Sequence, residues 1–150
     1  MTDAGYFHDG MPLPVVEPTT SVFWEGCAAE ELRIQRCETC GNYRHPPSPI
    51  CSNCRSFAHT WEHSEGGGRV FSYTIVHHSV HPASDERVPY NVSVIQLDDC
   101  GGVRVISNVV GCPNEEIAIG LPVRVTWEPV DPSLRLYRFT RREPGGCRGM

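Results

Sequence analysis

The sequence predicts a mainly β protein in which a helix and a small metal-binding ribbon precede a small β-barrel. Two observations lead to this prediction. Two Cys-x2-Cys pairs, with ten residues between them, lie in the stretch CETCGNYRHPPSPICSNC that runs from Cys37 to Cys54. From residue 69 onward, apolar and polar residues alternate in short runs separated by turn residues, a pattern typical of strands.

Length and composition limit the classes of function. The 150 residues carry 13 arginines and no lysine against 18 acidic residues, so the formal net charge is −5. This balance argues against a nucleic-acid-binding protein, which needs a basic surface. The sequence contains neither an apolar run of the roughly 20 residues that a membrane span needs nor the features of a signal peptide. We therefore expect a cytoplasmic protein.

The eight cysteines indicate a metal site together with free thiols, because thiols stay reduced in the cytosol. The pairs Cys37/Cys40 and Cys51/Cys54 each present two thiolates from a tight turn, and Gly41 suits a turn residue with positive φ. Four thiolates complete a closed tetrahedral Zn²⁺ site, which predicts a structural zinc. Iron in a rubredoxin-like site and a disulfide are the alternatives. His45 and His59 are interpreted as ordinary turn or surface residues.

The positions of prolines and apolar residues predict the structure of the segments before the second cysteine pair. Residues 1–20 contain three prolines, so we expect an extended segment that contacts a partner. Residues 21–65 form the predicted helix and zinc ribbon. Ser21 is the expected helix cap, and alternation of Leu32 and Ile34 with Arg33 and Gln35 predicts the strand that follows. The stretch YRHPPSPI is predicted to be a stiff finger with Arg44 and His45 at its tip.

Residues 66–140 are predicted to form the barrel, after a hinge at Gly66 to Gly68. The runs RVFSYTIVHH, YNVSVIQL, GVRVISNVV, LPVRVTWEPV and LRLYRFT supply five short strands. Phe71, Tyr73 and Ile75 are expected on one face of the first. This number of strands predicts a small closed barrel of the oligonucleotide/oligosaccharide-binding (OB) type, with a small β-sandwich as the main alternative. Residues 141–150 are the predicted flexible tail.

The order of these motifs resembles a known family. FWEGCAAEELRIQRCETCG, RHPPSPICSNC, GGGRVFSYTIVHH, VPYNVSVIQLD, GVRVISNVVGC and IAIGLPVRVTW together are similar to the zinc-ribbon and OB-fold proteins associated with acyl-CoA metabolism, long catalogued as a domain of unknown function. The resemblance covers about residues 20–140. It implies an auxiliary subunit of a thiolase-superfamily enzyme, in a heterotetramer with acyl-CoA at or near the interface. The most specific partner that the resemblance implies is a steroid-degrading aldolase, a lyase that shortens the steroid side chain.

The residues themselves provide no convincing catalytic set for thioester chemistry, which needs an activated nucleophile and oxyanion donors. We therefore predict no catalytic residue in this chain. Cys27, Cys100, Cys112 and Cys147 are interpreted as buried filler or exposed thiols. The predicted contacts with a partner or with a CoA thioester are Phe23, Trp24, Arg44, His45, His77, His78 and His81.

Three alternatives stay open from the sequence. The loop HHSVHPASDERVPYN offers imidazole and carboxylate groups to a second metal, but a plain polar loop, or one that contacts a partner, explains it better. Zinc ribbons and OB barrels also occur in nucleic-acid-binding proteins, a reading that the acidic charge opposes. A free-standing acyl-CoA-binding protein is the third alternative.

Overall fold

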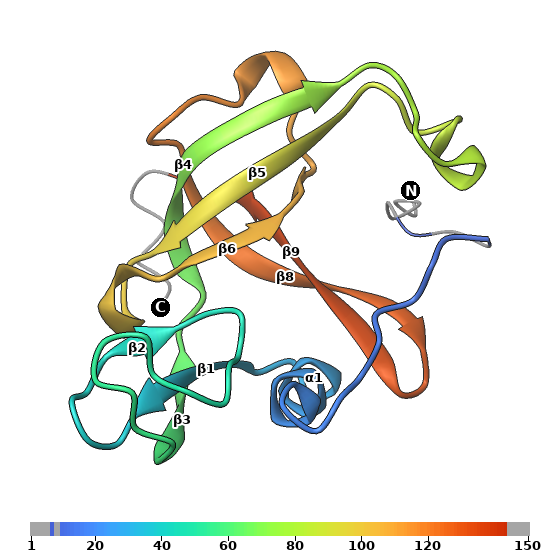
Figure 1. Ribbon diagram of the computed structural model, residues 1–150. Coiled ribbons are helices and arrows are strands. Elements are labelled where there is room, and N and C mark those ends of the chain that lie inside the picture. The colour runs from blue at the N-terminus through green and yellow to red at the C-terminus, as the bar shows by residue number, and fades with distance from the viewer. Residues whose placement is uncertain (1–6, 8–9, 144–150) are drawn as a thin grey trace.

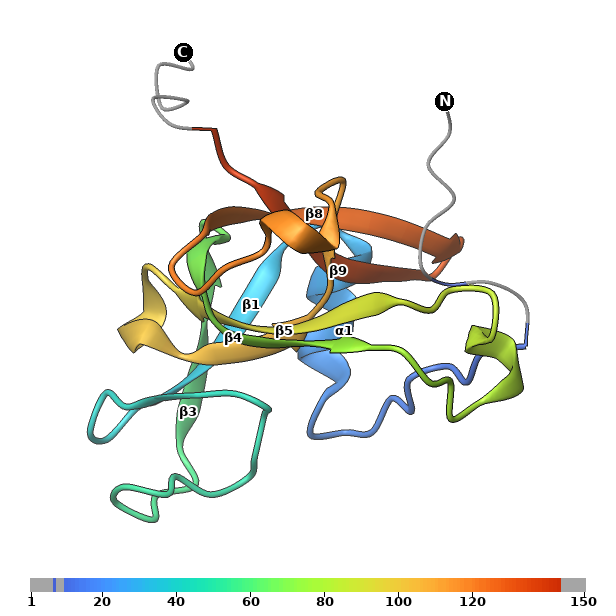
Figure 2. The same cartoon turned by 90° about the horizontal axis from the view of Figure 1, so that it is seen from above.

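The computed structural model describes residue 7 and residues 10–143 as a three-stranded ribbon and a curled six-stranded sheet, with one short helix between them in contact with both (Figures 1 and 2). The mainly β prediction is confirmed. The predicted flexible tail lies largely outside the described residues, although Arg141 is the last residue of a strand. Among the described residues, no helix has the length and apolar character of a membrane span.

The ribbon consists of β1 (Leu32–Cys37), β2 (Tyr43–Arg44) and β3 (His59–Ser64), in the antiparallel order β2-β1-β3. Leu32 and Ile34 are buried, as their alternation predicts. Gln35 breaks the pattern, because it is also buried, and its side-chain oxygen accepts a hydrogen bond from the backbone N–H of Ser48 at 2.8 Å. A polar side chain inside the ribbon thus anchors the finger between the two cysteine pairs.

The second sheet has the order β6-β5-β4-β8-β9-β7. Its strands are β4 (Gly67–Val76), β5 (Tyr90–Leu97), β6 (Arg104–Ser107), β7 (Val109–Val110), β8 (Pro122–Asp131) and β9 (Leu134–Arg141), and short 3-10 turns occur at Pro82–Ser84, Cys100–Gly102 and Asn114–Glu116. All pairings are antiparallel except that of β7 with β9. The hydrogen-bonded ladder does not close, but β6 and β7 at its two ends follow one another through Asn108, so the chain itself completes the circuit.

Asn91, the second residue of β5, bridges this gap. Its fully buried side chain donates from Nδ2 to the carbonyl of Val109 and accepts from the N–H of Val109, both at 2.8 Å. The hydroxyl of Ser93 also donates to Asn91 Oδ1 at 2.8 Å. A side chain therefore satisfies the backbone groups of β7 that face the interior, where an unpaired group is costly.

The helix α1 (Ser21–Ala28) links the two parts through one hydrophobic core. Phe23 is 2% exposed, and its ring lies 5.5 Å from that of Tyr137 on β9 in an edge-to-face arrangement. Ser21 is not the helix cap that the sequence predicts. Instead, α1 begins at Ser21 itself, and the Ser21 hydroxyl donates to the carbonyl of Pro18.

The glycines at the ribbon–barrel junction allow close packing. Gly66 has φ +85°, and a Cβ there would lie 2.3 Å from Val125. A Cβ on Gly68 would lie 2.5 Å from the carbonyl oxygen of Gln96, and Gly67 and Gly68 are already part of β4. The hydroxyl of Ser64 donates to the carboxylate of Asp99 at 2.7 Å across the same junction. The predicted hinge is therefore a packed contact between ribbon and barrel.

We expect Asn91→Leu to lower the free energy of unfolding by about 3 kcal/mol, because it leaves the buried N–H and carbonyl of Val109 unpaired. Asn114→Leu is the control, since it removes one exposed hydrogen bond to Pro89 and should change stability by less than about 1 kcal/mol. Urea unfolding followed by circular dichroism measures both. Equal stability of the two variants would contradict the bridging role of Asn91.

Candidate metal centre and contact surfaces

The two Cys-x2-Cys pairs form turns of the same design. In the first, the N–H of Gly41 donates to the carbonyl of Cys37 at 3.0 Å, and in the second the N–H of Arg55 donates to the carbonyl of Cys51 at 2.8 Å. Gly41 has φ +79°, as its place after the first pair predicts, and Arg55 adopts φ +67° at the matching position of the second. The repeated geometry directs all four thiols to one point between the turns.

The four sulfur atoms of Cys37, Cys40, Cys51 and Cys54 all lie within 4.8 Å of one another. Cys37 and Cys54 Sγ are 3.5 Å apart, and Cys40 and Cys51 Sγ are 3.7 Å apart. A tetrahedral Zn²⁺ with Zn–S bonds of about 2.3 Å places its sulfurs about 3.8 Å apart, so the donor set fits this ion. With four protein ligands the ion has no open position for water or substrate, and it would supply stability to the ribbon without taking part in a reaction.

Backbone amides prepare these thiols for metal binding. The N–H of Cys40 lowers the pKa of Cys37 to about 6, against the opposing effect of burial. The N–H of Cys54 likewise lowers the pKa of Cys51. Thiolates are the form that binds a metal, so the turns favour the required ionisation at Cys37 and Cys51. At Cys54 the N–H of Ser56 lowers the pKa, but burial and the neighbouring thiols outweigh it and raise the pKa to about 12.

Arg44 and His45 do not occupy an exposed tip, which differs from the prediction. Arg44 is 8% exposed, and its Nε and Nη2 donate to the carbonyl of Ser48 at 3.1 and 2.8 Å. The partly buried ring of His45 lies 5.1 Å from the ring of Phe23, and burial lowers the pKa of His45 to about 4. The finger therefore folds back onto α1, where Phe23 is buried and Trp24 is partly exposed. Contact of these residues with a partner remains a prediction.

The three loop histidines lie between β4 and β5, and all are exposed. His81 Nδ1 accepts a hydrogen bond from the N–H of Ala83 at 3.1 Å, which caps the short turn Pro82–Ser84. Within the part of the chain that the structure describes, the four cysteines are the one cluster with metal-ligand spacing, and His77, His78 and His81 do not belong to it. The second-metal alternative gains no support from these residues.

The N-terminal segment lies against this loop. Met11, Pro12, Leu13 and Pro14 line a largely apolar groove of about 430 Å³ together with His81 and Leu136. The carboxylate of Glu128 on β8 accepts from the N–H of Phe7 at 2.9 Å and from Nε of Arg138 at 2.7 Å, which ties the segment to the barrel. In both cartoons the segment runs from beside the loop between β4 and β5 to the start of α1 (Figures 1 and 2).

Apolar side chains on this face remain exposed. Leu13 is 54% exposed, Val15 76%, Val16 56%, and Val80 at the loop is 93% exposed. These four residues and the groove define what we call the N-terminal face. Exposed apolar groups that gather beside a groove mark an interaction surface.

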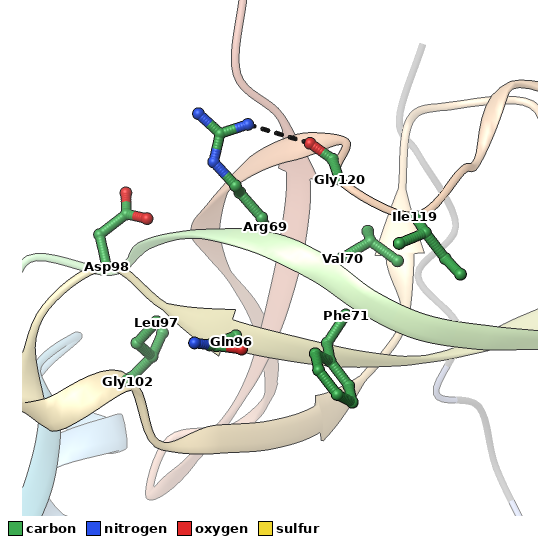
Figure 3. Close-up of a pocket in the computed structure, with 9 residues that line it drawn as sticks. All are labelled: Arg69, Val70, Phe71, Gln96, Leu97, Asp98, Gly102, Ile119 and Gly120. Carbon is green, nitrogen blue, oxygen red and sulfur yellow. Dashed lines mark hydrogen bonds between the residues drawn. The ribbon is translucent and has the colours of Figure 1, made fainter.

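A second groove at the other end of β4 was missed by the sequence analysis. It has a volume of about 410 Å³ and is lined by Arg69, Phe71, Gln96, Gly102, Ile119 and their neighbours (Figure 3). A register shift between Val70 and Ser72 makes Val70 the buried residue, so Phe71 is 43% exposed rather than sharing the buried face. Alternation alone does not reveal a bulge, which moves one side chain to the opposite face.

The described spare cysteines are poor nucleophiles. Burial raises the pKa of Cys27 to about 12 and that of Cys100 to about 11. Burial also raises the pKa of Cys112. Cys147 lies outside the described residues. Only thiolates attack thioesters efficiently, so these values favour the interpretation of the three thiols as structural.

Comparison with known proteins agrees with this architecture. Residues 24–60 match the domain described as ChsH2, rubredoxin-like zinc ribbon, and residues 61–128 match ChsH2, C-terminal OB-fold. A chain in the solved structure of an Ltp2-ChsH2(DUF35) aldolase is 36% identical with a TM-score of 0.77, over 86% of this chain and 98% of that one. A structure of a DUF35 protein from Sulfolobus solfataricus, at 16% identity and a TM-score of 0.60 over 83% of this chain and 86% of that one, shares the fold.

Curated relatives are longer proteins or scaffolds. The chain is 37% identical to the 3-oxo-4,17-pregnadiene-20-carboxyl-CoA hydratase alpha subunit of Mycobacterium tuberculosis over 132 residues, 87% of this chain. It is also 37% identical to a probable enoyl-CoA hydratase alpha subunit of Thermomonospora curvata, over 89% of this chain. The chain spans 40% of the length of each. A DUF35 domain-containing scaffold protein of Methanocaldococcus jannaschii is 32% identical, over 63% of this chain and 66% of that one.

A four-cysteine ribbon that shares its core with a curled six-stranded sheet defines the class of zinc-ribbon and OB-fold proteins. The extent of the matches then identifies the family. The chain belongs to the ChsH2 (DUF35) family.

We expect Cys40→Ser to reduce bound zinc from about one per chain to less than a tenth, because three thiolates hold the ion much more weakly than four. The ribbon should then lose its cooperative melting transition. Plasma mass spectrometry and calorimetry measure the two effects. Cys112→Ser is the matched control. Cys112 lies outside the ribbon, so this variant should keep its full zinc content. Full zinc content and unchanged melting in Cys40→Ser would refute the structural assignment.

A second prediction concerns acid. His45 has a pKa of about 4 in the folded chain and an ordinary value of 6.5, so the unfolded chain takes up a proton below pH 6.5 that the folded chain does not. This contribution to stability is present above pH 6.5 and is lost as pH falls toward 4. Relative to His45→Gln, the parent should lose about 1 kcal/mol between pH 7.5 and 5.5. Protonation of the cysteine thiolates affects both proteins equally and cancels in this comparison. Curves of unfolding free energy against pH that run parallel for the parent and His45→Gln would contradict the burial of His45.

Proposed function

We propose that this chain is a noncatalytic auxiliary subunit that binds a thiolase-superfamily acyl-CoA enzyme and supports its assembly and its acyl-CoA site. The observation that carries the proposal is the 36% identity to a chain of the Ltp2-ChsH2(DUF35) aldolase across 98% of that chain. Two copies of this chain with a thiolase-like dimer form the proposed heterotetramer, in the cytoplasm.

The reaction of the proposed complex is retro-aldol cleavage of a steroid side-chain CoA thioester. The likeness to a subunit named for a pregnadiene-carboxyl-CoA substrate supports this class of substrate. The chemistry is assigned to the partner, because the spare thiols described in this chain have pKa values raised by burial. One structural zinc on Cys37, Cys40, Cys51 and Cys54 holds the ribbon in this proposal.

The N-terminal face is the proposed docking surface for the partner. Its exposed valines and leucine lie beside an apolar groove, and loss of water from such a surface is the main favourable term in protein association. The exposed His77, His78 and His81 lie on the loop that borders this face, which supports their role as partner or acyl-CoA contacts. Phe23 and His45 pack against each other where the finger meets α1, the helix that follows the N-terminal segment.

We expect the double variant Val15→Asp with Val16→Asp to weaken binding of a co-expressed thiolase-like partner at least tenfold, because two carboxylates would have to lose their water at the interface. Co-purification and light scattering measure the complex. Ile119→Asp is the matched control, because Ile119 is as exposed as Val15, at 73%, but lies at the other end of the barrel. Zinc content and melting temperature should stay unchanged in both variants. Equal loss of partner in the control, or full binding by the double variant, would reject this docking surface.

A further inference from the structure

The loop between β4 and β5 carries an arginine whose charge is not neutralised. In the described part of the chain, five other arginines form ion pairs with carboxylates. The guanidinium of Arg87, which is partly buried, forms neither an ion pair nor a hydrogen bond with any described residue, and its Nε is buried. A buried N–H without an acceptor is destabilising, so the stability of the free chain does not explain this side chain.

Arg87 lines a small pocket of about 130 Å³ between this loop and the barrel. The other described residues of its wall are Met11, Ser84, Tyr90, Asn108 and Arg138, none of which is acidic. Glu128 lies outside this wall and neutralises Arg138, because its carboxylate accepts from Nε of Arg138 at 2.7 Å. The uncompensated positive charge among the described residues of the pocket is therefore that of Arg87.

Hydrogen bonds hold the wall of the pocket in place. The N–H of Arg87 donates to the carbonyl of Ser84 at 3.0 Å. The buried hydroxyl of Ser84 in turn donates to the carbonyl of His81 at 2.9 Å. From β9, Arg138 Nη1 donates to Oδ1 of Asn108 at 2.6 Å. A group that enters the pocket thus meets a wall that is already ordered, which lowers the entropic cost of binding.

The size and the place of the pocket limit what can bind there. Sites for drug-sized ligands begin at about 300 Å³, so this pocket suits a single side chain and not a cofactor. It shares Met11, Ser84 and Arg138 with the apolar groove of the N-terminal face. A protein that covers this face therefore brings its own side chains to the mouth of the pocket.

We propose that the pocket receives the carboxylate of an aspartate or glutamate side chain of the thiolase-like partner. The guanidinium of Arg87 can donate two parallel hydrogen bonds to a carboxylate. One uncompensated charge matches a singly charged carboxylate better than a phosphate group, which carries up to two. The apolar side chains of the N-terminal face would exclude water from this pair. The inference rests on the proposed function and deepens it, because it names the chemistry by which the partner is recognised.

The test is calorimetric titration of the full zinc-loaded chain with the thiolase-like partner. We expect Arg87→Gln and Arg87→Met each to weaken binding at least tenfold and to reduce the loss of affinity as salt is raised. Arg87→Lys keeps the charge without the paired donors, so it should retain part of the affinity. Arg104→Gln is the matched control, because it removes the same charge from an exposed arginine outside the pocket, on β6.

Melting of the free variants separates a role in binding from a role in folding. Because the buried Nε of Arg87 has no acceptor among the described residues, Arg87→Met should keep its zinc and melt at the parent temperature or above it. A double-mutant cycle then combines Arg87→Gln with amide substitutions of the acidic residues on the partner's surface. We expect one of these residues to show a coupling of at least tenfold, which identifies the carboxylate.

Full binding by Arg87→Gln, an equal loss in Arg104→Gln, or the absence of coupling to any acidic residue of the partner would overturn the inference. A lower melting temperature of Arg87→Met would also overturn it, because the side chain would then have a structural role. In each case the proposed function stands as long as the parent chain binds the partner. A parent chain that binds no thiolase-like partner would reject the proposed function, and this inference with it.

Discussion

The convergence of four thiols from two turns is the constraint on which the ribbon and everything attached to it depend. A sheet whose middle strand has six residues and whose outer strand β2 has two buries too little apolar surface to be stable alone. Fixing residues 37–40 against residues 51–54 also fixes the finger between them. The finger places His45 against Phe23, and Phe23 in turn packs against Tyr137 of the barrel. The position of α1, and of the N-terminal segment before it, therefore follows from the metal centre.

The sequence was sufficient for the features that depend on local spacing. The cysteine pairs indicated the metal centre and Gly41 its turn, and alternation identified the five strand regions of the barrel, although the third of them divides at Asn108 into β6 and β7. Features that depend on contacts between distant segments were not predictable in this way. Gln35 is polar yet buried because a backbone N–H thirteen residues away needs an acceptor. Phe71 is exposed beside a register shift, and Arg44 is buried because its guanidinium donates to the Ser48 carbonyl within the finger.

The junction between ribbon and barrel combines both kinds of information. The sequence marks the GGG stretch at 66–68 as conformationally unusual. Glycine permits both a flexible hinge and close packing, and only the neighbouring residues in the structure decide between these two roles. Val125 and the Gln96 carbonyl occupy the space that side chains at Gly66 and Gly68 would need. With Ser64 bonded to Asp99, these contacts make the ribbon and barrel share one core.

The two surfaces discussed above differ in their chemistry as well as in their place. The N-terminal face is apolar, whereas the second groove combines Arg69 and Asp98 with the exposed ring of Phe71. The strand that connects them rises about 3.3 Å per residue, so Phe71 lies about 17 Å along β4 from Val76, where the loop begins. Side chains separated by more than about 10 Å without shared partners contribute additively. A substitution in the groove would therefore influence the N-terminal face only by a change in the sheet itself, and the Asn91 hydrogen bonds that hold β5 to β7 oppose such a change.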